Sequence, residues 1–389
     1  MATLPPELTE NALLDDAMLH TGLSDFGDDS FREPLRRLLL GLNGEAQLNA
    51  LGRQLHHERL RGFLVNRLRF ERLWREHPEI AEEEIAPPLV IVGLGRTGTT
   101  LLQRLLAVDE RFYAPLWWET RFPVPFQDED LQHPVARITT ALEEVRTMYA
   151  TVPNLEAIHP LDALQADEDI LLLEQSFHST TPESFARLPE FGHWLDNQDQ
   201  TPGYLYLKRL LQCLQWQKRQ RGIQAQRWLL KTPHHIHYMD TLLRVFPGAQ
   251  VIQTHRDPVT VIPSWASMVY ALWQQNSDAV DPVEAGHYWS EKMATGLDRC
   301  LQLRRRQGDA DWLDIHFQDT ATDPLGVLQR IYTFIGQDFP AQQRHAATTY
   351  LAENARNDRP PHHYTLAMFG FTEDGIRERY REYLARFID

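Results

Sequence analysis

One short stretch of this sequence, Gly93-Leu-Gly-Arg-Thr-Gly98, has the residue types that bind phosphate groups. It fits the G-x-G-x-x-G pattern of dinucleotide sites and also the first part of a P-loop. The usual P-loop lysine is replaced by Thr99, which Thr100 follows, and the nearby cation is Arg96. The aliphatic run LVIV precedes the stretch and a helical pattern follows it, so under either interpretation the amides of a helix start would face an anion. The stretch therefore predicts an anion site.

A dinucleotide site also needs an acidic residue at the end of the next strand, about 20 residues past the glycines. Glu119 stands 21 residues after Gly98. However, the segment Tyr113-Ala-Pro-Leu-Trp-Trp118 contains a proline and no aliphatic run, and two more prolines follow shortly, so a central strand is not expected there. A nicotinamide-dependent dehydrogenase therefore ranks last among the functional hypotheses.

Two further cations follow predicted strands. Lys231 comes directly after RWLL, and Arg256 ends the run AQVIQTHR, eight residues before Ser264. A guanidinium presents a rigid fork of donors that suits a phosphate group, and a serine hydroxyl can add one more donor. The carboxyl ends of parallel strands meet at one edge of a sheet, where ligands of α/β proteins bind. These side chains are therefore candidates for a second anion site close to the glycine-rich stretch.

The stretch Arg96-Thr-Gly-Thr-Thr resembles the 5′-phosphosulfate loop of sulfotransferases, which use 3′-phosphoadenosine 5′-phosphosulfate (PAPS) as donor. Arg256 and Ser264 resemble the pair that holds the 3′-phosphate in that family, and Lys231 stands where the family has a catalytic lysine. The segments WLDIHF and DTATDPLGVLQRIYTFIG are similar to the family's last core strand and following helix, so the matches span roughly residues 88–336 in order. The resemblance implies PAPS as cosubstrate and transfer of a sulfuryl group to a hydroxyl or amine of a small acceptor.

Sulfuryl transfer builds negative charge on the leaving phosphate oxygen and on the sulfuryl oxygens, so fixed donors must lie where that charge develops. The transferred group carries less negative charge than a phosphoryl group, so no metal ion is required and no metal site is predicted. The resemblance implies Arg96 and Lys231 as catalytic cations. The donor ligands that it implies are Arg96, Thr97, Gly98, Thr99, Thr100, Arg256 and Ser264.

The acceptor needs a base that removes its proton as it attacks. Cytosolic sulfotransferases place a histidine two residues after the catalytic lysine, but this chain has Pro233 there. Glu119-Thr-Arg resembles the stretch that carries the catalytic glutamate of tyrosylprotein-type sulfotransferases. Glu119 is therefore the predicted base, with His234 as the alternative. A purely structural ion pair of Glu119 with Arg111 or Arg121 is the competing interpretation.

Other sites and functions compete with this interpretation. The cluster His234-His235-x-His237 lacks the spacing of a zinc motif and has no cysteine nearby, which disfavours a metal site. Two other function classes stay open: a magnesium-dependent nucleotide phosphotransferase (kinase) with a modified P-loop, and a catalytically inactive nucleotide-binding module. The segment HHY at 362–364 resembles one found in bacterial sulfotransferases, and its residues predict no role.

The elements that must position these residues follow from hydrophobic patterning. Short aliphatic runs alternate with helical stretches, which is typical of a parallel sheet covered on both faces. The sequence therefore predicts an α/β, P-loop-type three-layer fold with a central parallel sheet. The predicted strands are Leu89–Val92, Arg227–Leu230, Ala249–Thr254 and Trp312–Phe317.

Helical segments are predicted around this sheet. Apolar residues such as Leu51 and Leu55 recur at three- and four-residue steps in the N-terminal part, which indicates amphipathic helices. Near the other end, Thr372 is the predicted N-cap of a terminal amphipathic helix. The predicted organisation is a helical N-terminal extension (1–86), a sulfotransferase-type core (87–340) that includes a helical cover over the active site (about 122–222), and a helical C-terminal segment packed on the core (341–389).

Composition limits the partners of this chain of 389 residues. Its formal charge of −15 repels nucleic acid and anionic membranes, its two cysteines favour a reducing compartment, and no apolar run is long enough to predict a membrane span. We expect a cytoplasmic protein without integral membrane association or a nucleic-acid partner, and a homo-oligomer is compatible with the sequence. Four aromatic residues near the predicted site are core residues or, if two of them face the pocket, walls for an apolar or aromatic acceptor: Trp117, Trp118, Phe122 and Trp265.

Overall fold

A computed structural model describes residues 7–151, 161–354 and 364–389, and its centre is one parallel sheet in the order β2-β3-β1-β4-β5. All four predicted strands are present. The fifth, β2, is a two-residue edge strand just before Pro115, where the absence of an aliphatic run gave no signal. The strands are β1 (Leu89–Gly93), β2 (Phe112–Tyr113), β3 (Arg227–Lys231), β4 (Gln250–His255) and β5 (Trp312–His316).

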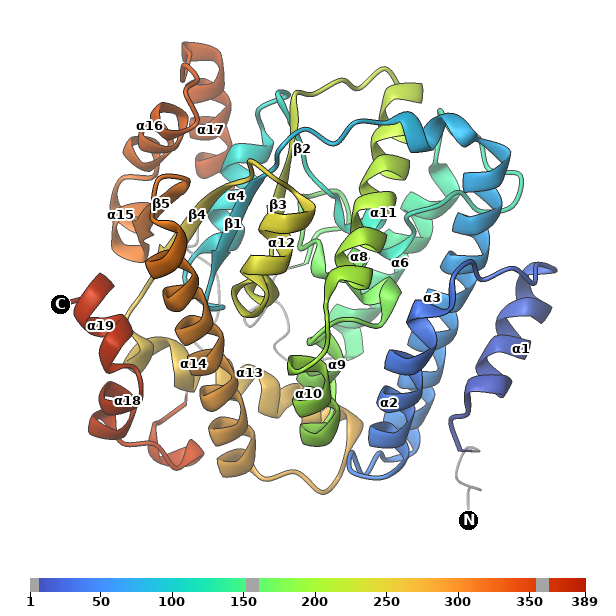
Figure 1. Cartoon of the computed structure of the whole chain (residues 1–389), viewed down its shortest axis with the longest axis horizontal. Helices are drawn as coiled ribbons and strands as arrows, with labels where there is room; N and C mark the ends of the chain where they lie inside the picture. Colours follow the sequence, from blue (N-terminus) through green and yellow to red (C-terminus); the bar gives the residue numbers. More distant parts are fainter. Residues whose placement is uncertain (1–6, 152–160, 355–363) are drawn as a thin grey trace.

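Helices cover both faces of the sheet, because alternate residues of each strand point to opposite sides. Leu89 and Ile91 belong to a core shared with one group of helices, and Val90 and Val92 belong to a core shared with the other. Figure 1 shows α12 and α14 lying across the front of the sheet. The first group is α4 (Thr99–Ala107), α16 (Pro324–Phe334) and α17 (Ala341–Glu353); the second is α11 (Thr201–Gln220), α12 (Met239–Val245), α13 (Pro258–Asn276) and α14 (Pro282–Gln307).

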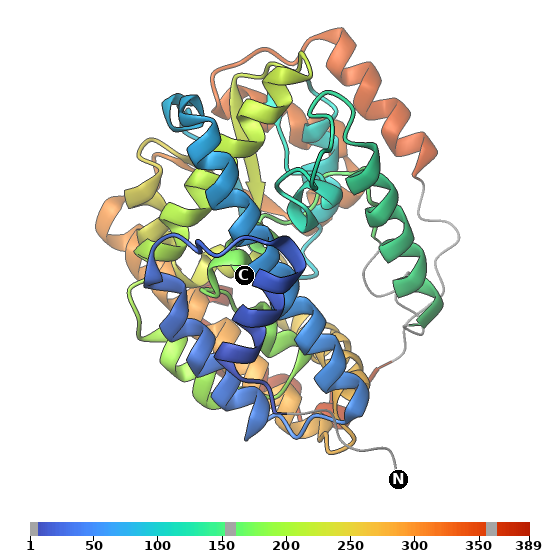
Figure 2. The same ribbon diagram turned by 90° about the vertical axis from the view of Figure 1, so that its right-hand side faces the viewer.

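The N-terminal part forms three α-helices on one side of the molecule, which faces the viewer in Figure 2. The helical prediction is confirmed, but Leu51 does not lie on the buried face as its spacing predicts, because it is exposed. The next residue, Gly52, faces the protein, where a Cβ would lie only 2.1 Å from the carbonyl oxygen of Asn276. These helices share a core with Phe177 and Leu195, far along the chain. They are α1 (Glu10–Thr21), α2 (Arg32–Asn43) and α3 (Ala50–Glu76).

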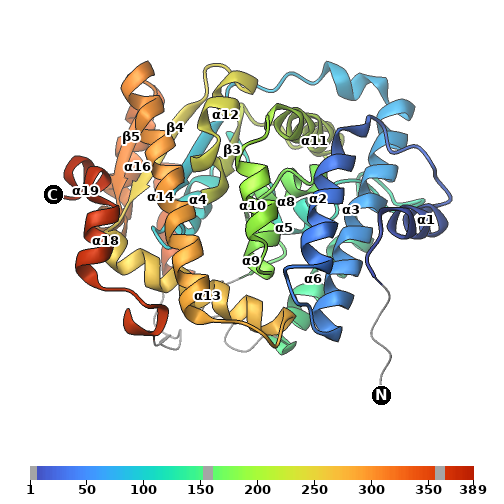
Figure 3. The same ribbon diagram turned by 60° about the horizontal axis from the view of Figure 1, so that its bottom comes forward.

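The described residues within 122–222 form helices and no strand, as the sequence predicts. In Figure 3, α10 lies between α2 and α14, and at its Gly192 a Cβ would collide with the Tyr288 hydroxyl of α14. The helices of this region that precede α11 are α6 (Val135–Thr151), α8 (Ile170–Leu173), α9 (Thr181–Phe185) and α10 (Pro189–Asp196), and a short α5 (Trp117–Arg121) comes before them.

The end of the chain packs on the sheet's last strands. Thr372 accepts a hydrogen bond from the Gly375 amide and so caps the next helix, as predicted. That helix is divided at Tyr380 into two short helices, whose apolar residues are buried. His362 and His363 lie outside the described residues. The remaining helices are α15 (Phe317–Thr322), α18 (Glu373–Arg379) and α19 (Arg381–Phe387), and short 3-10 helices occur at Asp29–Phe31, Pro78–Glu82, Glu174–Ser176, Pro233–His237 and Ala367–Phe369.

Candidate functional site

The loop between β1 and α4 has a backbone that depends on its glycines. Gly98 has φ of 84°, a left-handed conformation that glycine adopts without a steric penalty, and α4 begins at the next residue. At Gly95 a Cβ would lie 2.1 Å from the ring of Trp265, so only glycine fits under that ring. Arg96 is also left-handed, with φ of 70°, which is uncommon for a residue with a side chain. Such strain is concentrated at functional sites.

Three predicted donor ligands meet beside this loop. The Arg96 Nε lies 3.3 Å from the Ser264 hydroxyl, which α13 contributes. Arg256, which follows the last residue of β4, donates from Nη1 to the Arg96 carbonyl at 2.9 Å. Its guanidinium also lies 4.0 Å from the centroid of the Phe317 ring. The structure therefore brings the Arg256 guanidinium to the backbone of Arg96, 160 residues away in the sequence.

The threonines of the loop differ in what their hydroxyls contact. The Thr97 hydroxyl donates to the Leu94 carbonyl at 2.6 Å and lies 2.7 Å from the Thr254 hydroxyl, so it ties the loop to β4. This arrangement argues against the predicted use of that hydroxyl on a donor phosphate. The Thr100 hydroxyl, in contrast, lies 3.4 Å from the Lys231 ammonium.

Lys231, the last residue of β3, connects the loop to the helical region. Its ammonium donates to Glu168 Oε1 at 2.8 Å, and the Thr232 hydroxyl donates to the other oxygen of Glu168 at 3.3 Å. Lys231 is buried, while the Glu168 side chain keeps 19% of its surface exposed. Sequence reasoning missed Glu168. The pattern that could have revealed it is the run Asp167-Glu168-Asp169, three consecutive acidic residues within the mostly helical insertion.

Asp169 fixes this arrangement from the other side. One carboxylate oxygen accepts from the Lys231 amide at 2.7 Å, and the other lies 2.8 Å from His235 Nε2. His235 Nδ1 in turn lies 2.8 Å from the Tyr204 hydroxyl. Because a carboxylate only accepts, His235 Nε2 is the donor to Asp169. All three side chains are buried, so the neighbours Glu168 and Lys231 are held from both sides.

Glu119, the predicted base, lies in a different environment. Both of its oxygens accept from the Lys218 ammonium, at 2.6 and 2.8 Å, and one also accepts from Arg221 at 2.8 Å. Its carboxylate further accepts from the Leu116 amide, and the residue is completely buried. Burial by itself raises the pKa of Glu119, but the charges of Lys218 and Arg221 outweigh it and hold that pKa below its usual value. Because both oxygens of Glu119 already accept hydrogen bonds from the protein, this geometry argues against the predicted base role. It favours the structural ion pair, but with Lys218 and Arg221 as partners in place of Arg111 or Arg121.

His234, the alternative base, is also buried. Its Nδ1 lies 3.0 Å from the Thr180 hydroxyl and accepts from the Thr180 amide, while its Nε2 has no hydrogen-bond partner among the described residues. Burial, reinforced by nearby histidines and Lys292, places the pKa of His234 well below its usual value, so the ring is neutral at pH 7. In the described part of the chain, no three His, Cys, Asp or Glu side chains are arranged to hold a metal ion.

The aromatic residues near the predicted site are mostly core residues. Trp117 and Trp118 are buried in a small cluster with α6. Phe122 packs edge-on against Phe126, with ring centroids 5.2 Å apart. Trp265 lies against the phosphate loop at Gly95 and is half-buried, so it is the one of the four that borders the loop.

Comparisons with known proteins point to one family. Residues 87–341 match the model of the sulfotransferase family. The omega-hydroxy-beta-dihydromenaquinone-9 sulfotransferases Stf3 of Mycobacterium bovis and Mycobacterium tuberculosis are each 29% identical over 273 residues, which are 66% of this chain and 65% of the relative. The chain thus matches slightly less than two thirds of the length of these curated relatives.

Two crystal structures resemble nearly the whole chain. Sulfotransferase STF1 of Mycobacterium tuberculosis gives a TM-score of 0.85 at 31% identity and covers 97% of this chain and 99% of its own. Sulfotransferase STF9 of Mycobacterium avium gives 0.87 at 28% identity and covers 98% and 97%. These matches confirm the predicted α/β fold with a central parallel sheet. Among the described residues, none of the helices has the length and apolar character that crossing a bilayer requires.

Proposed function

This chain belongs to the sulfotransferase family, and we propose that it transfers a sulfuryl group from PAPS to a hydroxyl, or an amine, of a small apolar acceptor. The observation that carries the proposal is the meeting of Arg96, Ser264 and Arg256 beside one glycine-rich loop. The name of the Stf3 relatives, an omega-hydroxylated menaquinone sulfotransferase, supports an apolar acceptor that carries a hydroxyl group.

In this proposal, two parts of the loop region bind the two ends of the donor. The amides at the start of α4, with the hydroxyls of Thr99 and Thr100, would hold the 5′-phosphosulfate. Arg256 and Ser264 would hold the 3′-phosphate, which ATP lacks. Arg96 contacts both Ser264 and Arg256, so it lies where the two groups of ligands join.

We assign the base role to Glu168 in place of Glu119. Glu168 is partly exposed and hydrogen-bonded to Lys231, which itself reaches Thr100 of the loop. In the step, the acceptor oxygen forms a bond to sulfur, the bond from sulfur to the bridging phosphate oxygen breaks, and Glu168 takes the acceptor proton. Lys231 and Arg96 stabilise the charge that develops on the leaving phosphate oxygen.

The remaining expectations belong to the same proposal. The family match does not favour a magnesium-dependent phosphotransferase. Both cysteines, Cys213 and Cys300, are buried free thiols, which supports a cytoplasmic location. We also retain the division into an N-terminal extension, a core with a helical cover, and a C-terminal segment packed on the core. The contacts of Glu168 and Asp169 with the end of β3 support the covering role of the insertion.

Calorimetry with 3′,5′-adenosine bisphosphate in the presence of EDTA tests the donor site. Arg256→Ala should weaken binding by at least about 1.5 kcal/mol, more than tenfold in Kd, because a charge-assisted contact to the 3′-phosphate is lost. Arg305→Ala, which removes an exposed arginine paired with Glu382, is the matched control and should leave Kd unchanged. Sulfur-35 transfer from PAPS to a panel of apolar alcohols, phenols and amines then identifies the acceptor class. Tighter binding of ATP, or transfer that requires magnesium, would overturn the proposal.

A further inference from the structure

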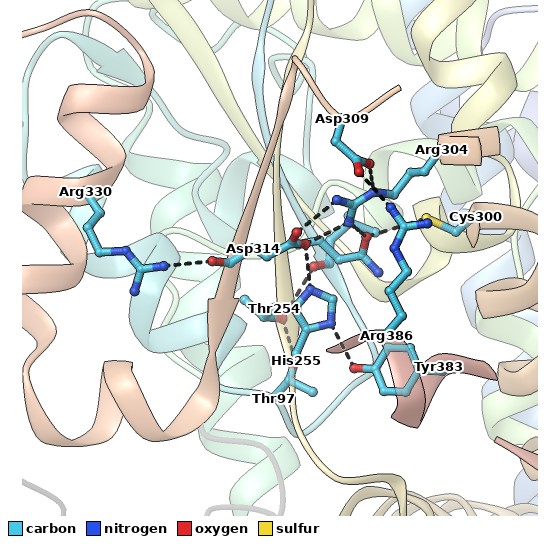
Figure 4. A network of polar contacts seen from close by, with 12 residues as sticks. Thr97, Thr254, His255, Cys300, Arg304, Asp309, Asp314, Arg330, Tyr383 and Arg386 are labelled. Carbon is cyan, nitrogen blue, oxygen red and sulfur yellow. Dashed lines mark hydrogen bonds and ion pairs between the residues drawn. The ribbon is translucent and has the colours of Figure 1, made fainter. Parts of the chain in front are cut away.

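A second polar network is centred on His255, the residue before Arg256, where β4, β5 and the C-terminal helix α19 meet (Figure 4). His255 Nε2 lies 2.8 Å from Asp314 Oδ1 on β5, and its Nδ1 lies 3.0 Å from the Tyr383 hydroxyl on α19. The His255 ring also stacks on Phe387 of α19, with ring centroids 4.1 Å apart and planes 17° from parallel. The last residue of β4 is therefore held by the helix that ends the chain.

The direction of these hydrogen bonds follows from the charges around Asp314. Arg304 donates to both Asp314 oxygens, at 2.7 and 2.9 Å, which keeps that carboxylate ionised and able only to accept. His255 therefore donates through Nε2, and its Nδ1 accepts from the Tyr383 hydroxyl. Burial lowers the pKa of His255, which agrees with a neutral ring. One tautomer thus satisfies both contacts.

The last two residues of β4, Thr254 and His255, and the next residue, Arg256, each make a different contact. Thr254 bonds to Thr97 of the phosphate loop, His255 to α19, and Arg256 to the Arg96 carbonyl. The backbone between Thr254 and Arg256 is short, so a shift of the His255 ring would move the start of the Arg256 side chain.

We propose that α19 is a positioning element of the donor site, in which Tyr383 holds His255 and so fixes Arg256 in the place that binds the 3′-phosphate. This inference rests on the proposed function, because it needs Arg256 to be the 3′-phosphate ligand. Tyr383 is a positioning residue and contacts no reacting atom. Its effect should therefore appear in donor binding, and only for ligands that carry the 3′-phosphate.

Tyr383→Phe and Tyr380→Phe form a matched pair of variants. Both tyrosines are buried near the C-terminus, and each loses one hydroxyl contact as phenylalanine. The Tyr380 hydroxyl, however, donates to the Ser290 carbonyl on α14 at 2.7 Å and has no contact with β4. General destabilisation of the C-terminal helices should therefore be similar in the two variants, while the effect on β4 should differ.

Calorimetry on the full chain with 3′,5′-adenosine bisphosphate and with 5′-AMP tests the proposal. We expect Tyr383→Phe to raise Kd for the bisphosphate about fivefold, the size of effect that one neutral hydrogen bond gives, with Kd for 5′-AMP unchanged. The KM for PAPS should rise by the same factor with little change in kcat. Tyr380→Phe should change neither Kd.

Two results would overturn the positioning role. One is that Tyr383→Phe weakens the binding of 3′,5′-adenosine bisphosphate and of 5′-AMP equally. The other is that Tyr383→Phe and Tyr380→Phe weaken bisphosphate binding equally. A further result is that the wild type binds the bisphosphate tightly and Arg256→Ala leaves its Kd unchanged. That result would overturn the 3′-phosphate assignment and this inference with it. If Arg256→Ala weakens binding and Tyr383→Phe does not, only the inference fails.

Discussion

Two lysine–glutamate pairs lie at strand β3, one near its start and one at its end, and they differ in how completely the protein satisfies the hydrogen-bonding capacity of the carboxylate. Near the start, the Lys218 ammonium lies 5.9 Å from the centroid of the Trp228 ring and binds both oxygens of Glu119. At the end, Lys231 binds one oxygen of Glu168. Since a strand rises about 3.3 Å per residue, Trp228 and Lys231 are roughly 10 Å apart along the strand.

The difference supports the assignment of the base role to Glu168. Glu119 accepts hydrogen bonds from two cations and one backbone amide and has no exposed surface. Glu168 keeps a fifth of its side-chain surface exposed, and its lysine also contacts the phosphate loop. A carboxylate that is fully satisfied by its own protein stabilises the fold, while one that is partly open at a strand's carboxyl end can receive a proton from a substrate. The two glutamates should therefore respond in opposite ways to the same substitution.

Glu168→Gln should give the largest effect. We expect kcat to fall by about 10²–10⁴-fold, because the acceptor loses its general base. The Kd for 3′,5′-adenosine bisphosphate should stay within about twofold, since no donor contact is removed. Steady-state kinetics and calorimetry on one preparation measure both quantities. Near-normal turnover would return the base role to Glu119 or His234.

Glu119→Gln should instead reduce stability. Removing this charge leaves the buried Lys218 and the partly buried Arg221 without a counterion, which costs on the order of 3–5 kcal/mol. Urea unfolding measures the loss, and kcat of the folded fraction should stay near the wild-type value. Glu144→Gln, in a partly exposed pair with Arg121, is the matched control and should cost less than about 1 kcal/mol. A large fall in kcat at unchanged stability would contradict the comparison.

The stability difference between wild type and Glu119→Gln should also depend on pH. This pH-dependent change should be smaller than the whole stability difference. Folding lowers the pKa of Glu119 below its usual 4.5, so its contribution is fully present above that value and is lost as the pH falls through the folded pKa. The difference should be constant from about pH 6 to 8 and shrink below about pH 4.5. Urea titrations at a series of pH values check this, and a difference that grows on acidification would show the wrong sign.

Three residues predicted for the donor side, Arg96, Arg256 and Ser264, meet in the structure, and the patterns that identify them are local. The phosphate loop is one strand, turn and helix start, and Arg256 and Ser264 are eight residues apart on one strand–helix unit. Their meeting with Arg96 then follows from parallel strands with a shared carboxyl edge. The same aliphatic runs predicted four of the five strands.

The acceptor side depends on contacts that no local pattern reveals. Glu168 is 63 residues before Lys231, and only the folded insertion brings them together. Glu119 matches a catalytic motif, yet the lysine that binds it comes 99 residues later in the chain. Leu51 was placed on the wrong face because periodicity cannot show that the adjacent Gly52 must approach the Asn276 backbone.

The core that joins α1–α3 to the insertion has a consequence for synthesis of the chain. Leu64 is fully buried in that core, but its partners Phe191 and Leu195 are translated roughly 130 residues later. At ribosomal rates this delay is on the order of ten seconds. During that time the apolar face of the N-terminal helices has not yet met its partners from the insertion.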